Sequence, residues 1–271
     1  MSILIKGGRV ITASDDYVAD VFIGDHRVSQ IGRSLDLDAD RVIDASGKYL
    51  LPGGIDVHTH MDTSFGESDP TTCDDHTTGT VAAAFGGTTT IVDFAVQLPG
   101  ETFAEALGNW HDKLERNPPV VDVGFHLIVS DLVSGGSSDD LATIVAEGVP
   151  SLKLFMAYPG LVMVDDETLF RTMQIAAETG ALVMVHAENG GAIEVLIEQA
   201  LAEGRTDPKH HALTRPPAME GEATNRAIEL ANLAGCPLYV VHVTCTDSIE
   251  PIERARRAGR RVWGETCPQY L

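Results

Sequence analysis

Short apolar runs alternate along most of the chain with longer segments in which apolar residues recur every three or four positions. The first 50 residues differ, because they hold only short runs rich in β-branched residues, separated by turn residues. We expect strands at residues 3–6, 9–12, 18–23, 27–31 and 41–44. Closely spaced strands predict one layer of a small β-sandwich over residues 1–50, which needs a partner layer to bury its apolar face.

From residue 51 the pattern predicts strands and amphipathic helices in alternation. Seven strands are expected, at residues 53–60, 88–94, 121–129, 151–156, 181–186, 238–243 and 261–265. Helices are expected between them, and the one at residues 166–179 should end at Gly180. This alternation is typical of an α/β protein with a parallel sheet, and we predict a TIM-like (β/α)8 barrel over residues 51–271.

A barrel of this kind has eight strands. We therefore expect a chain truncated at its C-terminus, with strand eight and its helices beyond residue 271. The alternative fold is an open, doubly wound sheet. Its nucleotide-binding version is disfavoured, because no G-x-G-x-x-G or Walker-type loop follows the first strand of the alternating region.

Composition narrows the class of protein. The net charge of −21 argues against nucleic acid or an anionic membrane as the main partner, since phosphate binding needs clustered Lys and Arg. No apolar run reaches the roughly 18 residues of a membrane-spanning helix, and the N-terminus lacks a signal-peptide pattern. The four cysteines form no C-x-x-C pair, so we expect reduced thiols in a cytoplasmic protein.

Four histidines are expected at the carboxyl ends of three strands. His58 and His60 end the first strand of the alternating region, His186 ends the fifth, and His242 lies late in the sixth. Residues two apart in a strand point to the same side, and the carboxyl ends of barrel strands form one face. Imidazole suits zinc and similar ions, so we predict a metal site there.

We expect the remaining histidines and the acidic residues to have structural rather than catalytic roles. We expect His126 to pack in the core, and the acidic residues to lie mostly on helix faces. Four further histidines are expected to be solvated: His76, His111, His210 and His211.

Lys153 lies within an apolar strand, where a full positive charge is costly to bury. Burial favours the neutral amine, which is a nucleophile and can take up carbon dioxide to form a carbamate. A carbamate is an anionic ligand with two oxygens, and it can bridge two metal ions about 3.5–4 Å apart. The alternative is a lysine whose ammonium group extends to solvent.

Several segments resemble the cyclic-amidohydrolase branch of the amidohydrolase superfamily, and within it the D-hydantoinase/dihydropyrimidinase family. The main ones are residues 56–60 (DVHTH), 151–158 (SLKLFMAY), 184–189 (MVHAEN) and 241–244 (VHVT). Three further segments agree: residues 86–90 (GGTTT), 215–217 (RPP) and 265–267 (ETC).

The resemblance implies a barrel flanked by a β-sandwich, with a centre of two divalent metal ions, zinc by preference. His58 and His60 would bind the more buried ion. His186 and His242 would bind the more exposed ion, and Lys153, carboxylated on its side-chain nitrogen (N6), would bridge the two.

The implied reaction opens the ring amide of hydantoins or 5,6-dihydropyrimidines, with a hydroxide nucleophile, to give N-carbamoyl amino acids. Tyr158 would be catalytic, with its hydroxyl bonded to the developing oxyanion of the bound substrate. Phe65 and Phe155 would form hydrophobic walls for the substrate's exocyclic group. The family's proton-carrying aspartate follows strand eight and so falls beyond residue 271. A neutral cyclic diamide is the implied partner, together with copies of the same chain in a homo-oligomer, a tetramer by resemblance.

Neighbouring families are the alternatives. Dihydroorotase-like sequences carry an arginine two residues after the second histidine, where this chain has Asp62, and allantoinase-like sequences carry a run that residues 61–65 (MDTSF) do not match. A non-catalytic, dihydropyrimidinase-related scaffold protein is a third possibility. Scaffold relatives have lost metal ligands, whereas the expected ligands up to residue 271 are present here, so metal content separates the classes.

Overall fold

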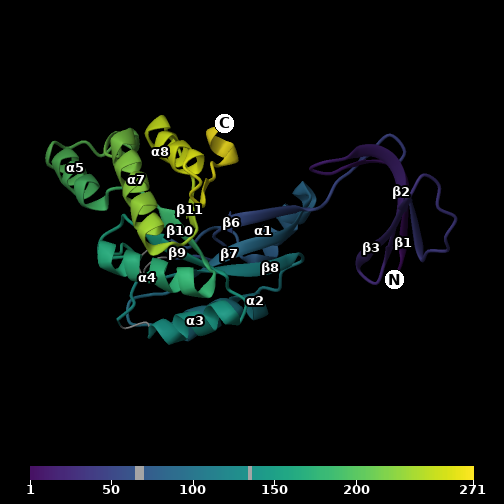
Figure 1. The fold of residues 1–271 in the computed structure, drawn as a ribbon, viewed down its shortest axis with the longest axis horizontal. Helices are drawn as coiled ribbons and strands as arrows, with labels where there is room; N and C mark the ends of the chain where they lie inside the picture. The colour runs from purple at the N-terminus through teal and green to yellow at the C-terminus, as the bar shows by residue number, and fades with distance from the viewer. Residues whose placement is uncertain (65–69, 134–135) are drawn as a thin grey trace. The chain divides into compact units, whose positions relative to one another are not determined.

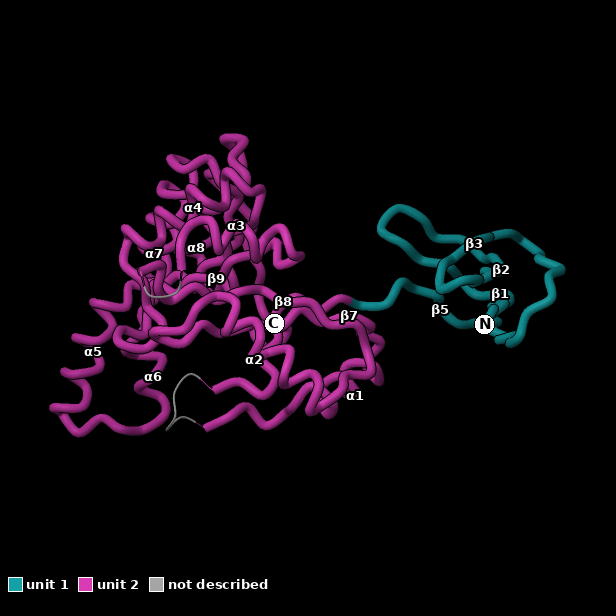
Figure 2. The backbone as a smooth tube through the Cα atoms, turned by 90° about the horizontal axis from the view of Figure 1, so that it is seen from below, with its two compact units in different colours: residues 1–54 teal, residues 55–271 magenta. Residues whose placement is uncertain are grey.

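Two compact units make up the chain, residues 1–54 and residues 55–271 (Figure 2). The structure, a computed structural model, describes residues 1–64, 70–133 and 136–271. Among these residues, no helix is long and apolar enough to cross a membrane.

The first unit holds a single five-stranded sheet in the order β3-β2-β1-β4, with β5 also paired to β1. Its strands are β1 (Ile3–Ile11), β2 (Asp16–Gly24), β3 (Arg27–Gly32), β4 (Arg41–Asp44) and β5 (Tyr49–Leu50). The two strands predicted within residues 3–12 are one strand, so the predicted turn at Gly7-Gly8 is wrong. Gly7 and Gly8 instead lie at an irregularity in the pairing of β1 with β2. Gly7 has φ +67° there, and its N–H donates to Asp20 Oδ1 (2.8 Å).

The second unit is built on a seven-stranded sheet whose strands lie side by side in chain order (Figure 1). From β7 to β12 each neighbouring pair is parallel, which confirms the predicted α/β sheet. The strands are β6 (Gly54–Thr59), β7 (Thr88–Val96), β8 (Asp122–Ile128), β9 (Ser151–Phe155), β10 (Leu182–His186), β11 (Leu238–Val240) and β12 (Val262–Gly264).

Helices connect these strands, and α2, α3, α4, α7 and α8 pack against one another in that order. Their bounds are α1 (His76–Gly86), α2 (Phe103–Arg116), α3 (Ser138–Ala146), α4 (Asp166–Thr179), α5 (Gly190–Ala202), α6 (Lys209–Leu213), α7 (Pro217–Ala234) and α8 (Thr246–Arg257), with a 3-10 turn, η1 (Pro268–Tyr270). As predicted, α4 ends at Gly180, which adopts a left-handed conformation. The short α6 includes His210 and His211, for which the sequence pattern predicts no helix.

The sheet is curled. Its outermost strands are β6 and β12, yet His58 on β6 is hydrogen-bonded to Glu265, the residue that follows β12. The carboxyl ends of the first and last strands are therefore brought together. All five residues of β9, at the middle of the sheet, are buried, as expected of a parallel strand covered on both faces.

Candidate active site

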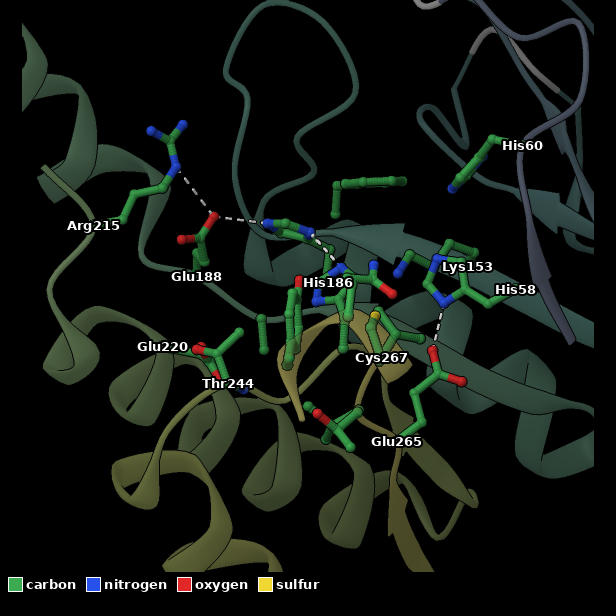
Figure 3. A pocket seen from close by; sticks show the side chains of 18 of the residues that line it. His58, His60, Lys153, His186, Glu188, Arg215, Glu220, Thr244, Glu265 and Cys267 are labelled. Carbon is green, nitrogen blue, oxygen red and sulfur yellow. Dashed lines mark hydrogen bonds and ion pairs between the residues drawn. The ribbon is translucent and has the colours of Figure 1, made fainter. Parts of the chain in front are cut away.

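A pocket of about 1000 Å³ opens at the carboxyl ends of the curled strands (Figure 3). The residues predicted for the site that line it are His58, His60, Lys153, Phe155, Tyr158, His186 and His242. The eighth predicted residue, Phe65, lies outside the described residues. Side chains from β6, β9, β10 and the segment after β11 thus meet in one cavity, as the placement of polar residues at strand ends predicts.

The four histidine rings form a connected group. The ring centres of His58 and His60 are 5.4 Å apart, those of His58 and His242 are 5.6 Å apart, and those of His186 and His242 are 4.7 Å apart. The closest approach joins His186 Nδ1 to His242 Nε2, at 3.0 Å. Each ring therefore has at least one other of the four as a neighbour.

Backbone strain marks this edge of the sheet. His242 was predicted to lie within a strand, but β11 ends at Val240, and His242 has φ +39°, which turns the chain out of the sheet. Tyr158, after β9, has φ +66°. A non-glycine residue in this region costs on the order of 1–3 kcal/mol, and such residues cluster at functional sites.

Lys153 is the most deeply buried polar group of the pocket. It is 1% exposed, and among the described residues its Nζ has no hydrogen-bond partner. Burial lowers its pKa to about 7, against the opposing effect of the Glu265 carboxylate. The alternative of an ammonium group that extends to solvent is therefore wrong, and near neutral pH a large share of this side chain is the neutral amine.

Two carboxylates that the sequence pattern did not single out contact the histidines. His186 Nε2 donates to Glu188 Oε2 (2.8 Å), and Arg215 Nε lies 3.6 Å from the same oxygen. Glu265 accepts a hydrogen bond from His58 Nδ1 through Oε1 and one from the Tyr239 hydroxyl through Oε2 (3.1 Å). Two sequence signals could have indicated these contacts. Glu188 comes two residues after the predicted ligand His186, and Glu265 lies at the end of a predicted strand.

The pKa values of both glutamates reflect these contacts. Burial raises the pKa of Glu188, but His186 and Arg215 more than offset it, so the net direction is downward. Burial likewise raises the pKa of Glu265, and His58 and Tyr239 lower it below its usual range. Both side chains are therefore carboxylates at neutral pH.

A third carboxylate, Asp93 on β7, is fully buried. Its Oδ1 accepts from Thr59 Oγ1 (3.3 Å) and from the Met61 N–H (3.1 Å), the two neighbours of His60 in the chain. Its Oδ2 is 3.0 Å from His76 Nε2 and accepts from Trp110 Nε1 (3.2 Å). The prediction that His76 is solvated is wrong, because its ring is 0% exposed and held by this carboxylate.

His126 is buried, as expected. Its Nε2 donates to the Val57 carbonyl oxygen (2.9 Å), and its Nδ1 contacts Ser151 Oγ. Burial lowers its pKa to about 4. Asp62 lines a second, smaller hollow together with Lys113 and Arg116, rather than the pocket of the histidines.

The donor set fits divalent metal ions. Burial lowers the pKa of His60 to about 4, that of His242 to about 2, and that of His186 as well, so these rings are neutral and have a lone pair to offer. Two nitrogens bound to one ion at about 2.0–2.1 Å lie roughly 3 Å apart, which matches the 3.0 Å between His186 and His242. Within residues 1–64, 70–133 and 136–271, no group of three or more His, Cys, Asp or Glu side chains forms a ready-made cage. The histidines instead lie as two neighbouring pairs in the pocket that Lys153 also lines.

Comparisons with known proteins show what the chain is similar to. The family described as Amidohydrolase family matches residues 41–121. The chain is 52% identical to the D-hydantoinase of Geobacillus stearothermophilus, over 100% of this chain and 57% of that protein. It is 42% identical to the dihydropyrimidinase of Rattus norvegicus, over 97% of this chain and 51% of that protein.

The fold is also similar to that of a solved structure. The crystal structure of dihydropyrimidinase from Brevibacillus agri NCHU1002 superposes with a TM-score of 0.96, at 54% identity, over 100% of this chain and 58% of that one. The chain thus spans little more than half the length of these relatives. The predicted resemblance is confirmed: over its whole length the chain is a homologue of D-hydantoinases and dihydropyrimidinases.

Proposed function

We propose that the protein hydrolyses the ring amide of hydantoins or 5,6-dihydropyrimidines to give N-carbamoyl amino acids. The observation that carries the proposal is the pocket that four histidines and the buried Lys153 line together. Its relatives at 52–54% identity are named D-hydantoinase and dihydropyrimidinase, which supports this reaction over that of another cyclic amidase.

Two divalent ions, zinc by preference, would be held by His58 and His60 on one side and by His186 and His242 on the other. When bound, they would supply a nucleophile from water at neutral pH and polarise the scissile carbonyl. Lys153 would join them as a carbamate: its neutral amine attacks carbon dioxide, a C–N bond forms, and one proton leaves to solvent. The low pKa of Lys153 supports this step, since only the unprotonated amine reacts.

Tyr158 and Phe155 would act on the substrate. Burial raises the pKa of Tyr158 above its ordinary value, so its hydroxyl stays protonated and can donate to an oxyanion. The Tyr158 ring centre lies 5.1 Å from that of His186, which supports a role for Tyr158 beside the proposed reacting centre. Phe155 is 6% exposed and stacks on His186 at 5.3 Å, and with Phe65 it would form the wall for an exocyclic substituent.

For the whole protein we propose a (β/α)8 barrel in which an eighth strand lies between β12 and β6. The N-terminal sheet would be one layer of a β-sandwich. A homotetramer in the cytoplasm, which does not bind nucleic acid or membranes, completes the proposal.

Turnover of a panel of cyclic amides tests the proposal. Hydantoin, 5,6-dihydrouracil, allantoin and dihydroorotate would be incubated with the zinc-loaded protein, and the ring-opened products separated by chromatography. We expect products from the first two. Product from allantoin or dihydroorotate alone would move the protein to a neighbouring family, and no stoichiometric metal at all would favour a scaffold protein.

A further inference from the structure

We propose that Glu188 and Glu265 are positioning residues that fix the tautomers of His186 and His58, and so decide which nitrogen of each ring faces a bound divalent ion. The inference rests on the proposed metal site, but its first test needs no metal. One contact lies at the end of β10, an interior strand, and the other joins the two edge strands, β6 and β12; Figure 3 shows them as separate pairs in one pocket.

The His186 pair shows the principle. A carboxylate can only accept hydrogen bonds, so the ring nitrogen that faces Glu188, Nε2 at 2.8 Å, must bear the proton. In a neutral imidazole the other nitrogen then has the lone pair. That nitrogen is Nδ1, which lies 3.0 Å from His242 Nε2, where the two rings converge. Glu188 thus directs the lone pair of His186 to the point where an ion would sit.

The His58 pair uses the opposite nitrogen. Here Nδ1 faces Glu265 and bears the proton, so Nε2 is the nitrogen that is left to bind. The two residues are 207 positions apart in the chain, and only the curl of the sheet brings them together. The two carboxylates therefore select different tautomers in two histidines of the same pocket.

Each glutamate is itself held in place. Arg215 Nε lies 3.6 Å from Glu188, and both side chains are 15% exposed. The Tyr239 hydroxyl donates to the second oxygen of Glu265 (3.1 Å), which leaves the first oxygen for His58. These contacts favour the charged form of each carboxylate. A hydrogen-bonded partner of this kind typically changes metal affinity 10- to 100-fold.

The first test reads the tautomers directly. Nitrogen-15 NMR of histidine-labelled, metal-free protein distinguishes a ring protonated at Nδ1 from one protonated at Nε2. We expect His58 to be protonated at Nδ1 and His186 at Nε2 in the wild type. Glu265→Ala should change the signals of His58 only, and Glu188→Ala those of His186 only. Glutamine at either position keeps an acceptor oxygen, so Glu265→Gln and Glu188→Gln should retain the wild-type tautomer in larger part.

The second test measures zinc affinity by competition with a chromophoric chelator. We expect the Kd for zinc to rise roughly 10- to 100-fold in each alanine variant and less in each glutamine variant. The control is Glu253→Ala, which removes an exposed ion pair to Arg257 on α8 and should leave both measurements unchanged. Where an alanine variant does not fold, the glutamine variant supplies the comparison.

Unchanged tautomers, or an unchanged Kd for zinc in variants that fold, would overturn the positioning role. Loss of the wild-type tautomer with weakened zinc binding would support it. Turnover tests the proposed reaction separately. The wild type could bind zinc and show the expected tautomers, yet open no cyclic diamide. That result would count against the proposed reaction and not against the role of the glutamates.

Discussion

Replacing Asp93 by asparagine would change one atom in a fully buried cluster. The carboxylate accepts two donors through each oxygen: Thr59 and Met61 through Oδ1, and His76 and Trp110 through Oδ2. The asparagine amide keeps one acceptor oxygen and puts an NH2 group in place of the other. Turning the amide does not help, because the Met61 N–H stands on one side and the Trp110 N–H on the other, and both can only donate.

The cost follows from the donors that lose their acceptor. With the amide nitrogen toward Trp110, the indole N–H is left buried without a partner, which costs about 1–3 kcal/mol. His76 can accept from the amide only if its proton moves to Nδ1, a buried atom without a hydrogen-bond partner in the described part of the chain. With its proton on Nε2, His76 loses its acceptor, and with its proton on Nδ1, it buries a donor that has no partner. Either state adds a second penalty of about 1–3 kcal/mol. We therefore expect the free energy of unfolding to fall by about 4 kcal/mol.

For a unit of roughly 150–250 residues, about 4 kcal/mol corresponds to a decrease in Tm of roughly 8–16 °C. Urea and thermal denaturation of the metal-free protein, followed by circular dichroism, would measure both quantities. The matched control is Asp122→Asn at the exposed start of β8, which should change stability by less than about 0.5 kcal/mol. An Asp93→Asn protein as stable as this control would refute the assignment of Asp93 as the acceptor that holds both neighbours of His60.

Three further predictions concern the pocket and its surroundings. Tyr158→Phe should lower kcat for hydantoin by about 100-fold with metal content unchanged, and steady-state kinetics that show full kcat would remove Tyr158 from the reaction. Phe155→Leu should raise KM for a phenyl-substituted hydantoin roughly tenfold relative to unsubstituted hydantoin, and equal effects on both substrates would contradict its role as a wall. His126, with its pKa lowered to about 4, binds fewer protons in the folded than in the unfolded chain below pH 6.5. The free energy of unfolding of the metal-free protein should therefore fall between pH 6.5 and 4, by about 3 kcal/mol from this group, and urea denaturation of His126→Gln should show a smaller fall.

Features that depend on neighbouring residues in the chain could be predicted from the sequence. The central strands are apolar runs bounded by glycines and charged residues, and Lys153 is conspicuous as a charge inside such a run. The expectation that His58 and His186 end their strands follows from the same pattern, and the parallel sheet then places them on one edge.

Features that depend on contacts between distant segments could not be predicted in this way. The pairing of Glu265 with His58 exists only because the sheet curls, which no local pattern encodes. His76 looked like an ordinary loop histidine, and only the packing of α1 on β7 shows its buried partner, Asp93. Asp93 gives the same local signal as Lys153, a charge within an apolar strand, which could have indicated its burial, but its partners are visible only in the structure.

The left-handed backbone at His242 is a further feature that the sequence pattern did not predict. The apolar run through Val243 predicts a continuous strand, yet the chain leaves the sheet after Val240. The Val241 N–H still bonds to the Val185 carbonyl oxygen (3.2 Å), and the turn that follows carries the His242 ring to His186. The strain is local to the residue whose side chain enters the pocket.

The central claim is that Lys153 joins two metal ions in a site that opens cyclic amides. Metal analysis of the wild type and of Lys153→Ala, with turnover of hydantoin and 5,6-dihydrouracil measured on the same samples, tests it most directly. We predict about two divalent ions per chain in the wild type, and loss of metal together with turnover in the variant. A wild type without bound metal, or a folded variant that retains full turnover, would contradict the claim.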